Sequence, residues 1–476
     1  MKAFIPVIFI LLIIGSCSTE SNENEQLLTQ RISRIENGLQ PNVQIEGDKA
    51  PTYNMEARLR ELGIPGVSIA VVNKGELEWA KGYGMADSSE NRSVTAETMF
   101  LAGSISKPVS ALRAHQLAEQ GVISLDSNVN DYLVNWKLPD NEFTAKEKVT
   151  VRRILNHTAG LTVHGFPGYD KGDTIPSIPE VLDGKGNTGP IRVFKEPGES
   201  WQYSGGGYTI MQQLMTDVEG KTFPELMQTN VLDPMGMTKS TFENPLPATY
   251  HAIAATGYRR NGQEVEGKWP IYPEMAAAGL WTTPSQLVRY GLEIQQIYQS
   301  RKDGLLKAKT VDEMLTAGMN DYGLGPAVQE YTFGHNGADE GFRAALIAWK
   351  EKPVAAVVMV NSDNGSIIQE IMLSIAAEYG LPGVEPIKRV YQQQSAQQLQ
   401  RYAGKYQIPN LGEVEIVVKD NGLLHLAPFA PEPIFLLPSS DSTFFNTNGG
   451  AYMEFVRDGE EYRSFKFYGF EASKIK

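Results

Sequence analysis

Ser104 and Lys107 are the two residues whose types and spacing first suggest chemistry. They lie in the stretch 100–112, where Gly103 predicts a turn and the apolar residues that follow recur at helical spacing. Residues three apart share a helix face, so we expect the Ser104 hydroxyl and the Lys107 ammonium to lie together at the positive end of the helix dipole. A serine becomes a good nucleophile when a neighbour takes its proton, and a partly desolvated lysine can do this.

The Ser-x-x-Lys spacing is weak evidence when it stands alone. A four-residue pattern with two fixed positions is expected about once or twice by chance in a chain of this length. Ser473 and Lys476 repeat the spacing at the C-terminus. Whether Ser104 is a nucleophile therefore depends on the elements that position it and on further motifs.

The elements around this stretch predict an α+β fold. Residues 65–82 predict a β-hairpin, and residues 342–360 predict a second one, followed by a helix at 367–379. Residues 110–160 and much of the middle third look helical. Strands at both ends with helices between them indicate an antiparallel sheet flanked by helices, beside a mostly helical subdomain, and clefts form where such layers meet.

Four stretches carry a resemblance to a known family. They are residues 65–72, Ser104-Ile-Ser-Lys107, Tyr203-Ser-Gly205 and His335-Asn-Gly337. In their order and wide spacing they resemble the serine β-lactamase and penicillin-binding-protein superfamily, in particular its class C-like branch of peptidases and esterases. The resemblance covers residues 51–385 and implies a β-lactamase/transpeptidase-like serine hydrolase domain there.

The resemblance assigns a role to each motif. It implies that Ser104 is the acylated nucleophile, that Lys107 is its proton acceptor or electrostatic helper, and that Tyr203 is a second base that also protonates the leaving group. The oxyanion hole is expected from the backbone N–H groups of Ser104 and Ala338, because a tetrahedral oxyanion needs two preorganised donors. Free lysine and tyrosine both have pKa values near 10, so we expect proximity and partial burial to lower both.

Two positions depart from the family's pattern among the residues expected to bind substrate, which are Gly205, His335, Asn336 and Gly337. Gly205 stands where the family usually has Asn. His335-Asn-Gly337 replaces the Lys-Thr-Gly of efficient class C β-lactamases, and histidine is mostly neutral at pH 7. The resemblance therefore favours an ester or a D-residue peptide as substrate over a cephalosporin.

Composition limits the partners. The formal net charge of −13 argues against a nucleic-acid partner, which would need a basic footprint. The six histidines are scattered, and neither a His-Glu-x-x-His motif nor a pair of cysteines is present, so we expect no metal site and no cofactor. The expected partner is a small-molecule or peptide substrate, with cell-wall material as one source. The sequence gives no indication of the oligomeric state.

The N-terminus predicts export. Lys2 and an apolar run too short to span a bilayer are typical of a secretory signal over residues 1–16. Residues 14–17 resemble the bacterial lipobox, and Cys17 is the only cysteine of the chain. We therefore expect a lipid-anchored protein of the bacterial cell envelope, with residues 17–50 as a flexible tether that contains a short helix around residues 27–35. The retention rule of bacterial lipoproteins favours the outer membrane, because Ser18 follows the cysteine.

The C-terminal part has a different pattern. Residues 386–400 form a polar linker, and residues 401–476 alternate short strand-like runs with turn signals, which predicts a small all-β, barrel-like domain. It resembles the lipocalin-like domains appended to many class C-like hydrolases. We assign it no catalysis, only a role in covering the cleft or holding a polymeric ligand.

Together these features predict an extracytoplasmic serine hydrolase that acts through an acyl-enzyme on an ester, an amide or a D-residue peptide. The alternative is a non-catalytic cell-surface or peptidoglycan-binding protein that retains the fold. Gly205 supports this alternative, whereas the intact Ser104, Lys107 and Tyr203 oppose it.

Overall fold

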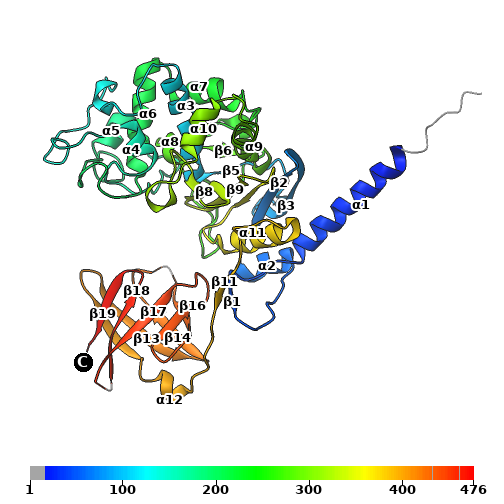
Figure 1. Cartoon of the computed structure of the whole chain (residues 1–476), viewed down its shortest axis with the longest axis vertical. Helices are drawn as coiled ribbons and strands as arrows, with labels where there is room; N and C mark the ends of the chain where they lie inside the picture. The colour runs from blue at the N-terminus through cyan, green and yellow to red at the C-terminus, as the bar shows by residue number, and fades with distance from the viewer. Residues whose placement is uncertain (1–16, 431, 460, 476) are drawn as a thin grey trace, which may run out of the picture.

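The computed structural model describes residues 17–430, 432–459 and 461–475. It shows a large α+β domain and a small β-barrel, which are joined near β1 and β11 (Figure 1). The predicted signal segment, residues 1–16, lies outside the described residues.

A seven-stranded antiparallel sheet forms the centre of the large domain, in the order β4-β3-β2-β10-β9-β8-β7. Both predicted hairpins are present, and β2 pairs with β10, so the two ends of the domain meet in mid-sheet. The fully buried strands β2 and β10 are rich in Val and Ala, as expected for strands covered on both faces. The strands are β2 (Gly66–Asn73), β3 (Glu76–Asp87), β4 (Arg92–Ser93), β7 (Ala327–Val328), β8 (Thr332–Asp339), β9 (Phe342–Trp349) and β10 (Ala355–Val360).

Helices cover both faces of this sheet. On one face lie α2 (Met55–Leu62) and the predicted helix α11 (Ser366–Tyr379). On the other lies α9 (Pro284–Ser300), followed by the helical subdomain. The helices of that subdomain are α3 (Ser106–Glu119), α4 (Val151–Leu155), α5 (Ile178–Leu182), α6 (Gly205–Glu219), α7 (Phe223–Met227), α8 (Met275–Ala278) and α10 (Ala308–Met314). It also contains single 3-10 or π turns at Gly103–Ile105, Val129–Asp131, Gln228–Leu232, Ala248–Tyr250 and Met319–Asp321. Two short strands, β5 (Phe100–Leu101) and β6 (Trp281–Thr282), pair with each other.

The helical structure expected over residues 110–160 is present as α-helix only at its two ends, in α3 and α4. Helix α3 ends at Glu119, and Gly121 follows with a φ of 71°. After it the Asn130 side chain donates to the Leu138 carbonyl and accepts from the Leu138 N–H, both at 2.8 Å. Such side-chain to backbone hydrogen bonds compete with helical ones, which explains the irregular path up to α4.

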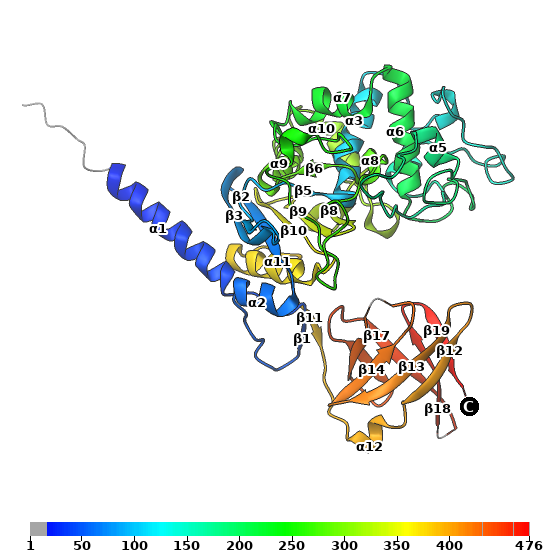
Figure 2. The ribbon, with the colours of Figure 1, turned by 180° about the vertical axis from the view of Figure 1, so that it is seen from behind.

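The N-terminal segment is helical over a longer range than the short helix that we expected around residues 27–35. Residues Cys17–Glu36 form a single helix, α1, whose first half projects away from the domain in Figures 1 and 2. Its last turns pack on α11, where Ile35 is buried, Ser374 donates to the Ile35 carbonyl at 2.9 Å and Arg34 pairs with Glu378 at 2.6 Å. No helix within the described ranges is long and apolar enough to cross a bilayer.

The C-terminal domain is a closed eight-stranded antiparallel barrel, as the strand-like runs predicted. Aromatic rings fill its interior, including Tyr402, Tyr406, Phe444, Phe455 and Phe465, all of which are buried. Its strands are β12 (Gly404–Ile408), β13 (Gly412–Lys419), β14 (Gly422–Leu426), β15 (Ile434–Pro438), β16 (Thr443–Asn446), β17 (Tyr452–Asp458), β18 (Glu461–Phe467) and β19 (Phe470–Lys474).

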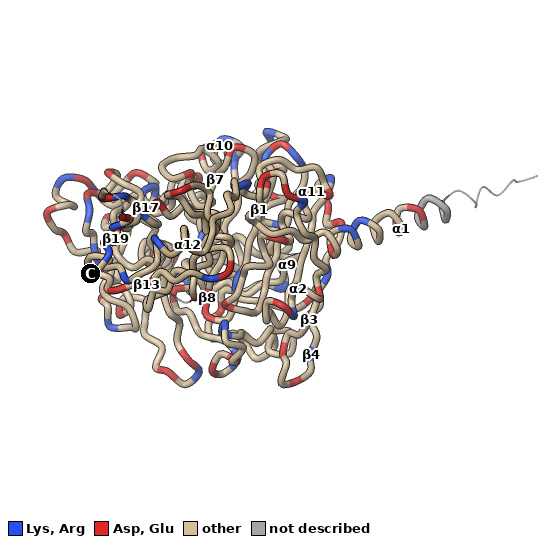
Figure 3. The backbone as a smooth tube through the Cα atoms, turned by 90° about the horizontal axis from the view of Figure 1, so that it is seen from below, with Lys and Arg blue, Asp and Glu red and all other residues tan. Residues whose placement is uncertain are grey.

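The connection between the domains is partly structured. Strand β11 (Ile387–Arg389) pairs in parallel with β1 (Val43–Ile45), and α12 (Ala396–Leu399) precedes the barrel. The loop around Arg260 also reaches the barrel, where its guanidinium lies 2.7 Å from the Glu432 carboxylate. Acidic and basic residues are interspersed along the backbone seen from below (Figure 3).

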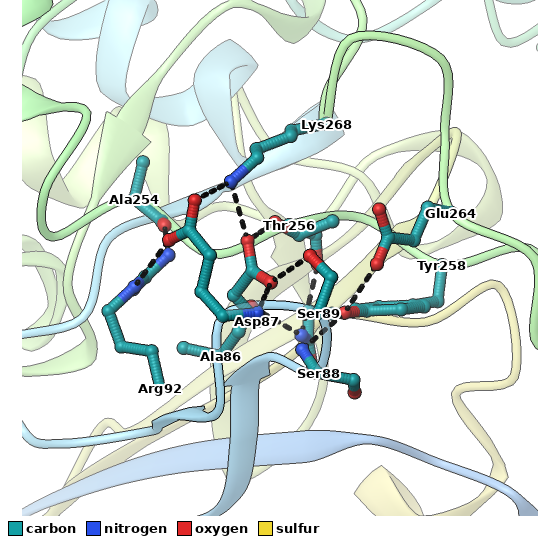
Figure 4. A network of polar contacts seen from close by, with 12 residues as sticks. Ala86, Asp87, Ser88, Ser89, Arg92, Ala254, Thr256, Tyr258, Glu264 and Lys268 are labelled. Carbon is teal, nitrogen blue, oxygen red and sulfur yellow. Dashed lines mark hydrogen bonds and ion pairs between the residues drawn. The ribbon is translucent and has the colours of Figure 1, made fainter.

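A buried polar network fixes the loop that leads toward α8 (Figure 4). The fully buried Asp87 carboxylate accepts from Lys268 at 2.8 Å, Thr256 at 2.6 Å and Ser89 at 2.7 Å. Burial by itself would raise the pKa of Asp87, but these hydrogen bonds outweigh burial and hold the pKa well below its usual range. Strand β3 is thereby tied to residues 256–268.

Candidate active site

The Ser104 hydroxyl lies at the start of α3, as the sequence predicted. Ser104 is in the 3-10 turn Gly103–Ile105, and Lys107 is in the first turn of α3. The Lys107 Nζ donates to the Ser104 Oγ at 2.9 Å. Gly103 has a φ of 53°, and a Cβ there would lie 2.5 Å from the Ala338 nitrogen, so only glycine allows this turn to approach β8 so closely.

Lys107 is held in a site that favours its neutral form. Its side chain is buried, and its Nζ also donates to the Ala277 carbonyl at 2.9 Å at the end of α8. Burial lowers the pKa of Lys107 to about 7, against the opposing attraction of Asp339. A substantial fraction of Lys107 is therefore neutral near pH 7 and able to accept the Ser104 proton.

Tyr203 completes the predicted trio, but its pKa moves the other way. The Lys107 Nζ lies 4.9 Å from the centre of its ring. Burial raises the pKa of Tyr203, and the nearby Ser104 hydroxyl offsets only part of this rise. The expectation that both pKa values are lowered is therefore wrong for Tyr203, because desolvation penalises the phenolate. Tyr203 remains a phenol that can donate a proton.

His157 holds Tyr203 in place. Its ring lies 4.2 Å from the Tyr203 ring, centre to centre. Its carbonyl accepts from the Gln202 N–H at 2.7 Å, and its Nδ1 accepts from the Ser204 N–H at 3.2 Å. The residues on both sides of Tyr203 are thus fixed to a single histidine.

Strand β8 brings the third motif against the nucleophile. A Cβ at Gly337 would lie 2.0 Å from the Ala102 carbonyl oxygen, so the strand and the turn before Ser104 touch through their backbones. The Ala338 nitrogen is next to Gly103 in the same approach. This arrangement supports the prediction that the N–H groups of Ser104 and Ala338 form the oxyanion hole.

His335 is neutral in this site. Burial, with the nearby Lys107, lowers its pKa to about 3. Its Nε2 lies 3.3 Å from the Tyr322 hydroxyl and its Nδ1 lies 2.5 Å from the Asn336 carbonyl oxygen. It is an uncharged hydrogen-bonding group, as the replacement of the family's Lys suggested.

Ser104 opens into a cleft of about 510 Å³. Three of the predicted binding residues, His335, Asn336 and Gly337, line it together with the oxyanion residue Ala338. The sequence reasoning missed the remaining lining residues, which are His164, Trp201, Tyr322, Arg343, Ala344, Ala345, Ile347, Gly365, Ile368 and Gln369. Trp201 could have been found, since it lies two residues before Tyr203 in a turn-rich stretch.

Gly205 does not line this cleft. It begins α6, and its N–H donates to the His164 carbonyl at 3.0 Å. A Cβ at this position would lie 3.1 Å from that carbonyl oxygen and 3.1 Å from the Phe166 ring. The place of the family's Asn side chain is therefore crowded by these two groups.

Two buried carboxyl groups near Lys107 were also missed. Asp339, directly after the oxyanion residue, is buried, and burial raises its pKa to about 8 against the pull of Lys107 and Arg343. Glu274, just before α8, has two carboxyl oxygens without a hydrogen-bond partner among the described residues, and burial raises its pKa to about 7. Among the described residues, no group of three or more His, Cys, Asp or Glu is placed to hold a metal ion.

Comparisons with known proteins agree with this geometry. Residues 53–370 match the Beta-lactamase family model, and residues 388–475 match a domain of unknown function, DUF3471. Penicillin-binding protein 4* of Bacillus subtilis is 23% identical over 431 residues, which cover 84% of this chain and 92% of that protein. The teichoic acid D-alanine hydrolase of Staphylococcus aureus is 24% identical over 282 residues, which cover 58% of this chain and 66% of that protein.

Solved structures share the fold. The octameric penicillin-binding protein homologue from Pyrococcus abyssi has a TM-score of 0.62 at 21% identity, over 96% of this chain and 100% of that chain. The structure of SurE with D-Leu has a TM-score of 0.57 at 19% identity, with the same coverage. With the family match over most of the hydrolase domain and the Ser104–Lys107–Tyr203 site in place, the chain belongs to the β-lactamase family of serine hydrolases.

Proposed function

We propose that this protein hydrolyses an ester or amide of a D-configured residue, outside the cytoplasm, through an acyl-enzyme on Ser104. The observation that carries the proposal is the hydrogen bond of 2.9 Å between Ser104 and a buried lysine whose pKa is lowered to about 7. The names of two similar proteins, a teichoic acid D-alanine hydrolase and SurE solved with D-Leu, support the D-configuration.

In the first half-reaction the Ser104 Oγ attacks the carbonyl carbon, and its proton moves to the neutral Lys107 Nζ. The negative charge that develops on the carbonyl oxygen is stabilised by the N–H groups of Ser104 and Ala338. When the tetrahedral intermediate collapses, Tyr203 donates its proton to the leaving oxygen or nitrogen. The Lys107 ammonium, 4.9 Å from the Tyr203 ring, supplies the charge that makes this transfer easier.

In the second half-reaction water attacks the acyl carbon, and the Tyr203 phenolate left by the first half-reaction takes a proton of this water. When the tetrahedral intermediate collapses, the bond from the Ser104 Oγ to the acyl carbon breaks and the Lys107 ammonium returns its proton to the Ser104 Oγ. Lys107 is then neutral and Tyr203 is again a phenol, so protons and charges balance over the cycle.

Intact-mass spectrometry tests this proposal on the protein without residues 1–17. Native protein and a Ser104→Ala variant are each exposed to a penicillin and, separately, to an activated ester. A Ser104-dependent adduct that decays with time is the expected result, and the faster acylating compound distinguishes peptidase-like from esterase-like chemistry. A folded native protein that forms no adduct with either compound would contradict hydrolysis and favour a binding protein.

We also propose that Cys17 carries lipid and anchors the protein in the bacterial cell envelope. The support is the lipobox-like stretch 14–17 and the lack of any other cysteine in the chain. Metabolic labelling with a fatty acid should label the full-length protein and fail to label a Cys17→Ser variant. Equal labelling of both proteins would refute the anchor.

A further inference from the structure

One buried histidine beside Tyr203 is not used by any of the steps above. His157 lies two residues after the end of α4, is 2% exposed and does not line the cleft. Its φ is 60°, in the left-handed region that favours Gly or Asn at the end of a helix. A histidine therefore stands here in spite of its backbone conformation, which indicates a role for its side chain.

The His157 ring is a neutral hydrogen-bond acceptor. Its Nδ1 accepts from the Ser204 N–H at 3.2 Å, so its proton is on Nε2, which has no hydrogen-bond partner among the described residues. Burial, with the positive charge of Lys107, lowers the pKa of His157 well below its usual range. A ring that stays neutral and does not reach the cleft exchanges no proton with a substrate, so its contacts must act through another residue.

Those contacts converge on Tyr203. The Ser204 N–H belongs to the peptide bond that follows Tyr203, so its bond to His157 fixes the plane of that peptide and with it the backbone of Tyr203. The His157 ring also lies 4.2 Å from the Tyr203 ring, at an interplanar angle of 32°. It meets the rings of Tyr322 and Trp201 nearly perpendicularly, with ring centres 5.1 Å and 6.1 Å away. These neighbours hold the imidazole, which therefore offers Tyr203 a rigid support.

Proton donation by Tyr203 matters more for some leaving groups than for others. When the tetrahedral intermediate collapses, the bond from the carbonyl carbon to the leaving oxygen or nitrogen breaks. The leaving atom keeps the electron pair and takes the proton of the Tyr203 hydroxyl. A nitrophenolate is stable without this proton, whereas an alkoxide or an amine anion is not. A proton donor displaced by about 1 Å can slow such a step by about a hundredfold.

We propose that His157 is a positioning residue, which holds the Tyr203 phenol where it can protonate the basic leaving groups of alkyl esters and amides. The inference rests on the proposed hydrolase function and narrows the leaving groups of its substrates. A site with this support for its proton donor suits an alkyl ester or an amide rather than an ester whose leaving group departs unaided.

The test keeps the acyl group and changes the leaving group. The p-nitrophenyl, phenyl and methyl esters of N-acetyl-D-alanine release progressively more basic groups, and kcat/KM reports their acylation of Ser104. His157→Phe keeps a ring but removes the acceptor of the Ser204 N–H. It should lower kcat/KM about a hundredfold for the methyl ester and less than about threefold for the p-nitrophenyl ester. His157→Asn tolerates the φ of 60° and offers an oxygen near the place of Nδ1, so it should lose only about tenfold on the methyl ester.

Two controls assign the effect to Tyr203. Tyr203→Phe removes the proton donor, so adding His157→Asn to that variant should leave the methyl-to-p-nitrophenyl ratio of kcat/KM unchanged. His425→Asn replaces a buried histidine of the barrel and should keep the native ratio.

The outcomes separate this inference from the proposed function. The positioning role is overturned, while hydrolysis stands, if folded His157→Phe and His157→Asn proteins slow all three esters by the same factor or not at all. It is also overturned if His157→Asn lowers the ratio equally with and without the Tyr203 hydroxyl. Should His157→Phe not fold, the ratio of His157→Asn decides alone. If no ester is hydrolysed in a Ser104-dependent way, the proposed function is refuted and the positioning role with it.

Discussion

The pH dependence of acylation tests whether Lys107 is the proton acceptor. Only neutral Lys107 can take the Ser104 proton, so the acylation rate should follow its neutral fraction. With a pKa of about 7, that fraction rises about tenfold between pH 6 and pH 8 and then levels off. A lysine with an ordinary pKa of about 10.4 would give a rise of about a hundredfold over the same range and no plateau until about pH 11.

Asp339 should move this profile. Its negative charge is the one opposing influence on the lowered pKa of Lys107, and the two groups titrate as a pair because the pKa of Asp339 is raised to about 8. Asp339→Asn removes that charge and keeps a side chain of the same size. Because the pKa of Asp339 is raised to about 8, Asp339 is mostly protonated where Lys107 titrates, so the rising limb should move only slightly, and to lower pH.

The assay is stopped-flow acylation by an activated ester between pH 5 and pH 10, with the adduct confirmed on Ser104 by mass. Asp48→Asn, on the exposed N-terminal segment, is a control for loss of a carboxylate and should leave the profile in place. A rate that keeps rising above pH 9 in the native protein, or a limb that Asp339→Asn moves to higher pH, would refute the role given to Lys107.

Three further changes have expected results. Gly205→Asn should lower the melting temperature and fail to speed lactam acylation, because a Cβ there already lies 3.1 Å from both the His164 carbonyl and the Phe166 ring; faster acylation at unchanged stability would contradict this. His335→Lys should raise kcat/KM for esters that carry a carboxylate relative to neutral esters. An unchanged ratio of the two kcat/KM values would show that residue 335 does not face the carboxylate of the substrate. Asp87→Asn should cost about 2 kcal/mol of unfolding free energy at pH 7 by denaturant titration. Since the pKa of Asp87 is lowered in the folded state, this difference should begin to shrink as the pH falls below the unfolded value of about 4 and should keep shrinking until the pH falls below the lowered folded value.

The fold was predictable where local patterns match local structure. The hairpins at 65–82 and 342–360 and the helix after them have alternating or helical periodicity, and they appear as β2–β3, β9–β10 and α11. The end of α3 near Gly121 was predictable, but the irregular path between α3 and α4 was not, because the Asn130 side chain forms hydrogen bonds with Leu138 that no periodicity reveals. Helix α1 was predicted only in part, around residues 27–35, since its polar sequence is stabilised by packing on α11.

The site was predictable only in its motifs. Ser104, Lys107, Tyr203 and the third motif could be named because the order of the four stretches is itself a signal. Asp339 could not be assigned a role, because its burial arises from how β8 packs in the folded domain. The direction of the Tyr203 pKa shift has the same origin, since desolvation is a property of the assembled site.

Because β2 pairs with β10, the catalytic centre is assembled from residues of two halves of the chain. Ser104 belongs to the first half and Ala338 to the second, and the exposed turn around Gly172 lies between them. A chain split at that turn would give two fragments, neither of which has both a nucleophile and a complete oxyanion hole. Ester hydrolysis would therefore report fragment complementation, with the β2–β10 ladder and the contact of α1 with α11 as the forces that reunite the halves.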